Sequence, residues 1–242
     1  ADAYRWRSLR GIINAAAYTA VDTAETEQGR AQAWAANATG VAALARIADG
    51  AGIPLVHVST DYVFDGSLPL GQEYTVDAPV APLSVYGQSK AAGEMAARSV
   101  ARHYIVRTSW VMGDAKNFVE IMKSLAERGV EPTVVADQHG RPTFTEDLAG
   151  AILHLVEAGC EYGTYHVSNT GDVITWADLA KTVFKATGHS PDRVTPVTTE
   201  QYFAKAEIFA PRPTNSAMDL SKIIETGFKP RSYQDALSAY LA

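Results

Sequence analysis

Cysteine, excess positive charge and long apolar runs are all scarce in this sequence of 242 residues. Cys160 is the one cysteine, so an intrachain disulfide and a cysteine-rich metal site are both excluded, and a reducing cytoplasm is the expected location. Lys and Arg number 21 against 27 Asp and Glu, a net charge of −6, which argues against nucleic acid as a partner. No apolar run approaches the roughly 18 residues of a membrane span, so no membrane partner is expected.

Several catalytic signatures are also missing from the sequence. It contains no Gly-x-Ser-x-Gly nucleophile elbow and no phosphate-binding Walker loop. The six histidines are scattered without the spacing of metal ligands, and we assign no metal site. His57, inside an apolar segment, is interpreted as a core residue. Neither serine hydrolysis nor metal-assisted hydrolysis is therefore predicted.

Apolar segments that alternate with amphipathic helices indicate an α/β protein. Strands are expected at 12–17, 53–59, 104–108, 133–135 and 164–167, and helices at 27–49, 85–101, 117–128, 145–158, 175–187 and 232–241. The rest of the last 50 residues is expected to form loops. Near-continuous apolar strands are typical of a parallel sheet covered on both faces. We predict a doubly wound, Rossmann-like parallel sheet with a smaller C-terminal substrate-binding region.

The predicted boundary between these two parts lies near Gly113. Residues 1–113 are expected to form a nucleotide-cofactor-binding Rossmann-like domain. Residues 114–242 are expected to be mainly substrate-binding, with some elements returning to the first domain. Ligands of such sheets bind beyond the carboxyl ends of the strands. The segments that follow the strands are therefore where site residues are expected.

Polar residues gather at one such strand end, in Ser59-Thr60-Asp61. The next helix opens with Tyr86 and carries Lys90 one turn later, on the same face. A nearby ammonium favours the phenolate, so Lys90 is expected to lower the pKa of Tyr86 and make it a general acid near neutral pH. A hydroxyl, a phenol and an ammonium in one crevice can bind a carbonyl oxygen and protonate it while a hydride reaches carbon. Taken alone, the residues at the strand end are explained equally well as caps of local turns.

Seven motifs along the chain make a more specific pattern. They are Asn14–Asp22, Asn37–Gly40, Ser59–Gly66, Tyr86–Lys90, Arg107–Trp110, Asp137–Thr143 and Arg212–Ser216. In this order and spacing they resemble the dTDP-4-dehydrorhamnose reductases of the extended short-chain dehydrogenase/reductase superfamily. The Tyr-x-x-x-Lys pair identifies the superfamily alone, whereas Ser-Thr-Asp-Tyr-Val-Phe, Arg-Thr-Ser-Trp and Arg-Pro-x-Asn-Ser are more specific.

The resemblance implies an oxidoreductase that uses NADPH or NADH. Its reaction would be reduction of the C4 ketone of dTDP-4-dehydro-L-rhamnose to dTDP-L-rhamnose, for bacterial cell-surface polysaccharide. Tyr86 would donate the proton, Lys90 would tune Tyr86 and hold the nicotinamide ribose, and Thr60 would bind the reacting oxygen. The nucleotide sugar is the expected small-molecule partner, and a homodimer is possible. Some members of the family need Mg²⁺, but no carboxylate cluster in this sequence allows us to assign it.

The remaining site residues follow from the same resemblance. The implied cofactor-binding residues are Ala17, Tyr18, Thr19, Val58, Tyr86 and Lys90. The implied substrate-binding residues are Thr60, Asp61, Trp110, Arg212 and Asn215. A place at the edge of the core is the alternative for Trp110, and Asn37 is interpreted as support for the backbone of the site.

One departure from the family concerns its Gly-x-x-Gly-x-x-Gly turn, which seats the cofactor pyrophosphate on a helix N-terminus. The sequence contains no match to this turn. About 45 residues of the first βαβ unit are absent when counted back from Asn14, and we expect that the sequence omits them. The choice between NADPH and NADH therefore stays open. So do two alternative functions: another nucleotide-sugar reductase or epimerase, and a non-catalytic nucleotide-binding regulatory subunit of the kind associated with methionine adenosyltransferase.

Overall fold

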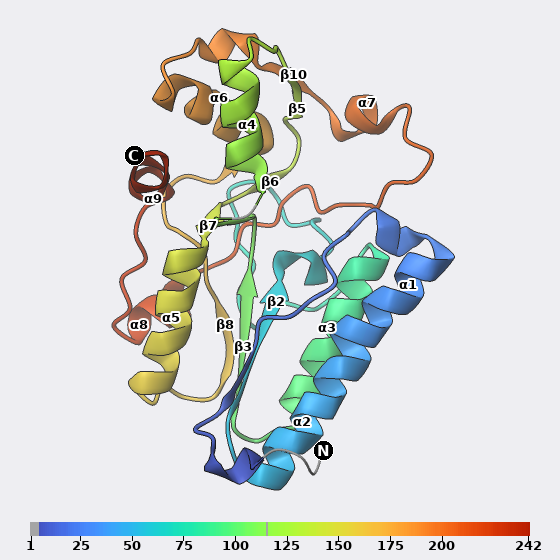
Figure 1. The fold of residues 1–242 in the computed structure, drawn as a ribbon, viewed down its shortest axis with the longest axis vertical. Coiled ribbons are helices and arrows are strands. Elements are labelled where there is room, and N and C mark those ends of the chain that lie inside the picture. Colours follow the sequence, from blue (N-terminus) through green and yellow to red (C-terminus); the bar gives the residue numbers. More distant parts are fainter. Residues whose placement is uncertain (1–4, 115) are drawn as a thin grey trace.

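A parallel sheet forms the centre of the structure (Figure 1). The computed structural model describes residues 5–114 and 116–242. The sheet has four strands in the order β1 (Ile12–Asn14), β2 (Leu55–Thr60), β3 (His103–Thr108) and β8 (Gly163–His166). All three strand pairs are parallel. This confirms the predicted parallel sheet of an α/β fold.

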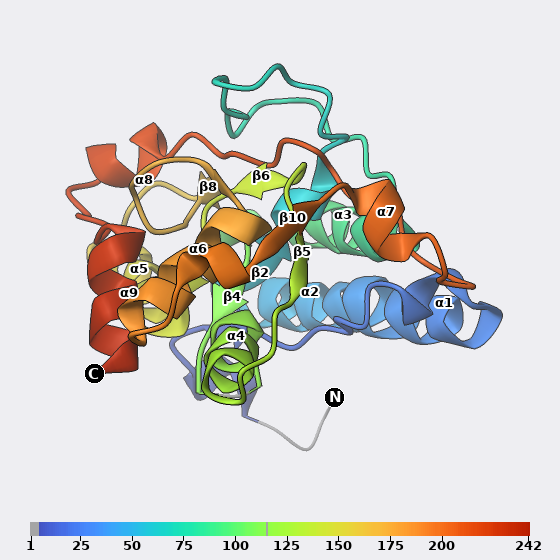
Figure 2. The ribbon, with the colours of Figure 1, turned by 90° about the horizontal axis from the view of Figure 1, so that it is seen from above.

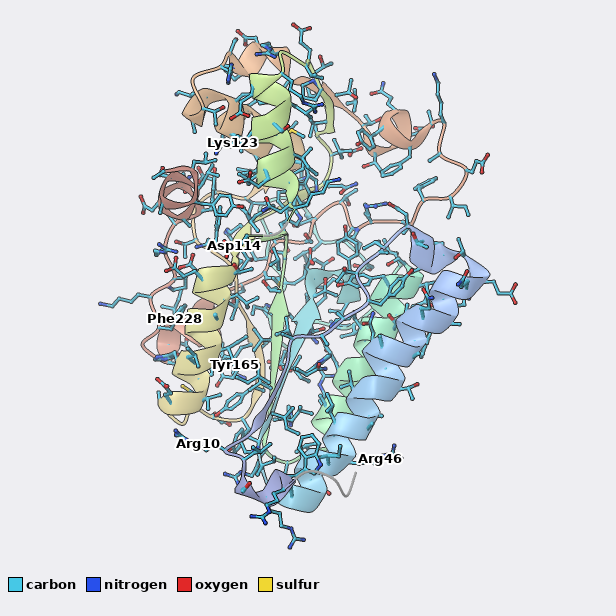
Figure 3. The ribbon with its side chains drawn as sticks, viewed as in Figure 1. Arg10, Arg46, Asp114, Lys123, Tyr165 and Phe228 are labelled. Carbon is cyan, nitrogen blue, oxygen red and sulfur yellow. The ribbon has the colours of Figure 1, made fainter. Side chains whose placement is uncertain are left out.

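Helices cover both faces of the sheet because its apolar side chains alternate between them. Leu55 and Ile105 pack with side chains of α2 (Gly40–Ala51) and α3 (Val85–Arg98). Val56 and Val106 face the other way, toward α5 (Thr145–Glu157) and α8 (Ser221–Glu225). Figure 3 shows Tyr165 between the sheet and α5, with Phe228 beside the same helix.

The helix predicted at 27–49 is divided into three pieces. α1 (Glu27–Trp34) runs into a π-helical turn (η3, Ala35–Thr39), and α2 follows directly. α2 ends where Gly52 adopts a φ of 70°, as helices that close with a left-handed glycine do. Wide π turns inside helices occur frequently at functional sites. Here the turn contains Asn37, whose contacts are described below.

A second group of elements packs above the carboxyl end of the sheet (Figure 2). It includes α4 (Phe118–Glu127), α6 (Trp176–Ala186) and α9 (Tyr233–Leu241), and the strands β5 (Thr133–Val135) and β10 (Thr195–Val197) pair beside them. α4, α6 and α9 share one apolar core. The remaining elements are β4 (Val111–Met112), β6 (His139–Gly140), β7 (Thr143–Phe144), β9 (Ile174–Thr175), α7 (Thr199–Phe203) and the short helical turns Trp6–Ser8, Thr23–Glu25, Asp61–Val63 and Pro191–Arg193.

The prediction of loops through most of the last 50 residues holds for 204–220 and 226–232, which lie outside helices and strands, but it missed three short elements. This segment contains β10, α7 and α8 before the final helix. These elements are too short to produce a periodic pattern, but α7 has a local signal in a capping box that Thr198 forms with Gln201. β8, α5 and α8 also bring later parts of the chain back to the sheet. Among the described residues, no helix is long and apolar enough to cross a membrane.

Candidate active site

A cavity of about 790 Å³, the main cavity of the candidate site, opens at the carboxyl end of the sheet. Thr60, Tyr86, Lys90 and Trp110 all line it, although they come from three separate stretches of the chain. Figure 3 shows Asp114 at this end of the sheet, opposite the end that carries Arg10 and Arg46. The structure thus brings together the hydroxyl, phenol and ammonium that the sequence pattern selected.

The end of β2 delivers Thr60 and Asp61. The Thr60 hydroxyl donates to Asp61 Oδ1 at 2.9 Å and accepts the backbone N–H of Tyr62 at 3.2 Å. Thr60 therefore both caps a turn and lines the cavity. The two interpretations of this segment, as a turn cap and as part of a binding site, are thus compatible. Asp61 Oδ2 finds no hydrogen-bond partner among the described residues. Burial raises the pKa of Asp61 to about 6, and hydrogen bonding with the hydroxyls of Ser216 and Thr60 opposes that rise.

α3 is held tightly at the N-terminal end that carries Tyr86. Ser84 caps it by accepting the N–H of Gly87, and Glu25 accepts the N–H of Val85 at 2.8 Å. A Cβ at Gly87 would lie 2.3 Å from the carbonyl oxygen of Tyr62. Only glycine at this position lets α3 approach the loop after β2 so closely. This close approach sets the distance between Tyr86 and Thr60.

Lys90 points from α3 to β2, where its Nζ donates to the carbonyl of Val58 at 2.6 Å. Burial lowers the pKa of Lys90 to about 8, and the charge of Glu94 opposes that effect. Burial likewise raises the pKa of Tyr86 to about 12; hydrogen bonding with Thr60 lowers it, and the charge of Asp61 raises it further. The expectation that Lys90 lowers the pKa of Tyr86 is thus wrong for this structure, because desolvation of the phenolate outweighs any nearby positive charge.

Asn37 ties the segment after β1 to α3. Its side chain accepts the N–H of Tyr18 at 2.8 Å and donates to the Tyr18 carbonyl at 3.1 Å and to Ser89 Oγ at 3.0 Å. Ser89 Oγ in turn donates to the carbonyl of Tyr86. The π turn thus places one buried amide between the 17–19 segment and the helix that carries the phenol.

The residues expected to bind the cofactor divide into two groups. Ala17, Thr19 and Val58 line the main cavity. Tyr18 does not line it, since its ring packs in a small apolar cluster with Val85 and Tyr86. The contribution of Tyr18 to the site is therefore through its backbone and through packing.

Trp110 lines the main cavity in a strained conformation. Its φ of 46° is the single positive φ of a non-glycine residue among the described residues. Such left-handed backbone costs about 1 to 2 kcal/mol for a residue with a Cβ. Its ring stacks on that of Trp176, with centroids 3.8 Å apart and planes at 16°. Strain of this kind is found at functional sites where the surroundings impose it.

Arg212 lines a second cavity of about 480 Å³, which shares Tyr62 and Trp176 with the first. It pairs with Asp22 at 2.8 Å, and its guanidinium lies over the ring of Phe203. Burial raises the pKa of Asp22, but hydrogen bonds from Arg212 and from the backbone of Ala210 outweigh it and leave the pKa lowered. This cavity therefore presents a cation and an aromatic ring beside the proposed reaction site.

The structure corrects the expectation for Asn215, which lines neither cavity. Its buried amide donates to the carbonyls of Leu68, Pro69 and Gln72. Its oxygen accepts the N–H of Ala217. With these bonds made, Asn215 anchors the 68–72 loop rather than facing a ligand.

Two residues of the site were missed by sequence reasoning. Tyr62 stands edge-on to Tyr86, with centroids 5.7 Å apart, and its position directly after Asp61 was an available signal. Trp176 had no signal, because its stacking on Trp110 depends on the tertiary fold. His57 is a core residue as expected: it is fully buried with Nδ1 on Asn14, and burial lowers its pKa to about 3. Within 5–114 and 116–242, no cluster of three or more His, Cys, Asp or Glu side chains could hold a metal.

Comparison with known proteins gives a consistent result. The family model described as the RmlD substrate binding domain matches residues 2–242. A dTDP-4-dehydrorhamnose reductase of Mycolicibacterium smegmatis is 40% identical over 235 residues, covering 96% of this chain and 69% of that protein. A probable dTDP-4,6-dihydroxy-2-methyloxan-3-one 4-ketoreductase of Streptomyces antibioticus is 38% identical over 233 residues, covering 93% of this chain and 75% of that protein.

Solved structures agree with these sequence matches. The dTDP-4-dehydrorhamnose reductase of Bacillus anthracis, in complex with NADP, superposes with a TM-score of 0.87 at 38% identity. The match covers 96% of this chain and 80% of that one. The chain therefore belongs to the dTDP-4-dehydrorhamnose reductase family.

Proposed function

We propose that this protein reduces the C4 ketone of dTDP-4-dehydro-L-rhamnose to dTDP-L-rhamnose with NADPH or NADH. The observation that carries the proposal is the cavity where Thr60, Tyr86 and Lys90 meet. Family membership supports the substrate and the reaction type. Thr60, Tyr86 and Lys90 are proposed as the catalytic residues.

The described residues fit the nicotinamide half of such a cofactor. The cavity wall beside Lys90 is apolar where Ile13, Ala17 and Val58 contribute to it, which suits a flat ring. Lys90 has three N–H donors and gives one to Val58, so hydroxyls of a ribose can take the others. When bound, the cofactor supplies the hydride. The Bacillus anthracis relative was solved with NADP, which supports the same cofactor type here without choosing between NADPH and NADH.

The side chains of this site manage the proton. With a pKa of about 12, Tyr86 is protonated at neutral pH and can donate to an alkoxide that forms at C4. Thr60 is placed to hydrogen-bond the same oxygen, and Asp61, which also lines the cavity, is proposed to bind a sugar hydroxyl. The second cavity, with Arg212, is proposed to take the negatively charged part of the nucleotide sugar.

The two parts of the chain divide this work in the proposal. Residues 1–113 provide the cofactor face and the proton donor, while 114–242 provide most of the substrate pocket and return β8 and α5 to the sheet. A cytoplasmic location and a homodimer belong to the same proposal and rest on the sequence pattern and the family resemblance. Mg²⁺ is not assigned.

A related ketone on another dTDP sugar is the second candidate substrate. The relative from Streptomyces antibioticus, named as a 4-ketoreductase of a different sugar, favours it. A non-catalytic regulatory subunit is disfavoured, since a binding protein has no need for Thr60, Tyr86 and Lys90 around one cavity.

The test is cofactor oxidation by the purified protein with each ketosugar, in wild type and in Tyr86→Phe. We expect wild-type turnover with the rhamnose precursor and a kcat lowered by roughly 10²- to 10⁴-fold in Tyr86→Phe. The circular dichroism spectrum of the variant should stay unchanged, and its cofactor Kd should change much less than kcat, because Lys90 and the apolar wall beside it are kept. Wild-type-like turnover by Tyr86→Phe would remove Tyr86 from the acid role, and preference for another ketosugar would move the substrate assignment.

A further inference from the structure

Trp176 occupies a rigid position where α6 begins beside α4 (Figure 1). The residue before it, Thr175, caps the helix by accepting the N–H of Asp178, and the Asp178 carboxylate accepts the N–H of Thr175 in return. Thr175 also belongs to β9, which pairs antiparallel with β6 through His139. The backbone on which the indole is mounted is therefore fixed from two sides.

The ring of Trp176 packs against two other aromatic rings. It is stacked on Trp110 at 3.8 Å, and Phe118 of α4 contacts it at 4.7 Å and 58°. Trp110 has no free space on the side of β6, since a Cβ at Gly140 would come within 3.1 Å of its ring. The ring of Trp110 is thus in contact with the ring of Trp176 and close to the backbone of Gly140.

Trp176 also borders both cavities. Both Trp176 and Tyr62 line the cavity that contains Tyr86 and the cavity that contains Arg212. These two residues thus belong to the wall of both the cavity of Tyr86 and the cavity of Arg212. No feature of the family comparison assigns a role to Trp176.

We propose that Trp176 is a positioning residue, which fixes the plane of Trp110 and thereby sets which face of the sugar ring meets the incoming hydride. The inference rests on the proposed function. A six-membered ketosugar can be reduced from either face of C4, and each face gives a different epimer at that carbon. A rigid aromatic wall permits one orientation of the ring, whereas a loose wall permits both.

The experiment compares Trp176→Phe and Trp176→Ala with wild type, and uses Trp34→Phe as the matched control. Trp34 is at the end of α1 and 41% exposed, so its replacement removes a tryptophan without touching either cavity. Three quantities are measured: the circular dichroism couplet that two stacked indoles produce, the ratio of C4 epimers in the product by NMR, and separate kcat and KM values for sugar and cofactor.

We expect Trp176→Phe to fold, to lose the couplet and to lower kcat/KM for the sugar by roughly two- to tenfold, the strength of one aromatic stack. The second C4 epimer should become detectable, more so in Trp176→Ala, while the cofactor KM stays at the wild-type value. Trp34→Phe should match wild type in all three measurements.

Two results would overturn this role. In an active enzyme, a couplet that survives Trp176→Phe would show that the stack is absent. A lost couplet with unchanged kinetics and a single epimer would show that the stack does not position the sugar. If Trp176→Ala does not fold, Trp176→Phe decides alone. A wild-type protein without reductase activity would contradict the proposed function itself. The wild-type assay comes first, so this result is distinguished from a failure of the role of Trp176.

Discussion

Replacing Asp61 with asparagine should stabilise the protein and impair its activity. The Asp61 side chain is 2% exposed, and its Oδ2 has no hydrogen-bond partner among the described residues. Burial raises its pKa from 3.8 to about 6, so the folded protein holds a proton more tightly than the unfolded chain does. Ionisation of Asp61 therefore costs stability, a cost that asparagine does not have.

The sign and size of this effect depend on pH. Below pH 3.8 the carboxyl is protonated in both states and the cost vanishes; it grows as pH rises and is complete above about 6. A difference of about two pKa units corresponds to about 3 kcal/mol at pH 7.5, and to about 1 kcal/mol at pH 4.5. The gain from Asp61→Asn should thus be about 2 kcal/mol larger at pH 7.5 than at pH 4.5.

Urea denaturation at these two pH values measures the gain directly. Comparing the two pH values cancels whatever the amide itself adds, since asparagine does not titrate. Asp65→Asn is the matched control: hydrogen bonds from Ser67 and Tyr74 lower the pKa of Asp65, so its replacement should lose stability. The loss should be nearly the same at pH 7.5 and pH 4.5, because this stabilisation disappears only as pH falls below the unfolded pKa of 3.8. A pH-independent effect of Asp61→Asn, or a loss at pH 7.5, would refute the reasoning.

Asp61→Asn is also expected to lower kcat/KM for the nucleotide sugar, because Asp61 lines the cavity and is proposed to contact the sugar. A stabilised but impaired variant is the usual result when a site holds a group that is unfavourable for folding. Unchanged kcat/KM would place Asp61 outside the substrate contacts.

Three further predictions concern the walls of the site. Wild-type kcat/KM should fall as pH rises through about 8, where the Lys90 ammonium loses its proton. Lys90→Met should bind the cofactor more weakly and should not show this fall. A cofactor Kd of Lys90→Met equal to that of wild type would exclude the ribose contact. Gly87→Ala should lower Tm and kcat together, since its Cβ would lie 2.3 Å from a backbone oxygen. Gly50→Ala is the control, because a Cβ there meets nothing within 4 Å; it should be neutral or stabilise the protein by about 0.5 to 1 kcal/mol. Equal Tm values for the two variants would argue against tight packing of α3. Arg212→Ala should raise KM for the nucleotide sugar much more than KM for the cofactor, and equal changes would indicate a structural role through Asp22.

Sequence periodicity was sufficient for the main elements of the fold. The strand at 133–135 was predicted with its observed bounds, and α3 was predicted three residues too long at its end. α7 and α8 have five residues each and were missed, because a single helical turn shows no repeating apolar face. The π turn at Ala35–Thr39 was missed for a different reason. It accompanies the tertiary hydrogen bond from the Asn37 amide to Ser89 of α3, and a tertiary contact leaves no local pattern in the sequence.

The site was predictable as a set of residues but not in its electrostatics. The i and i+4 spacing correctly placed Tyr86 and Lys90 in one cavity. It could not show that Lys90 donates to Val58 or that burial dominates the pKa of Tyr86. Both depend on how closely α3 packs against β2. Gly87 and Gly93 permit this close packing, but no local sequence pattern indicates it.

The polar atoms that the fold leaves unpaired point to what the cavity must hold. Of the buried side-chain atoms without a partner in the described part of the chain, three lie in the lining of the main cavity: Ser59 Oγ, Asp61 Oδ2 and Thr108 Oγ1. Each such group costs about 1 to 3 kcal/mol when it stays unpaired. Because each of these oxygens is buried beneath the cavity surface, a ligand reaches it only where the neighbouring side chains move aside. A hydroxyl-rich ligand can then pair with these atoms, which an apolar ligand of the same size cannot do.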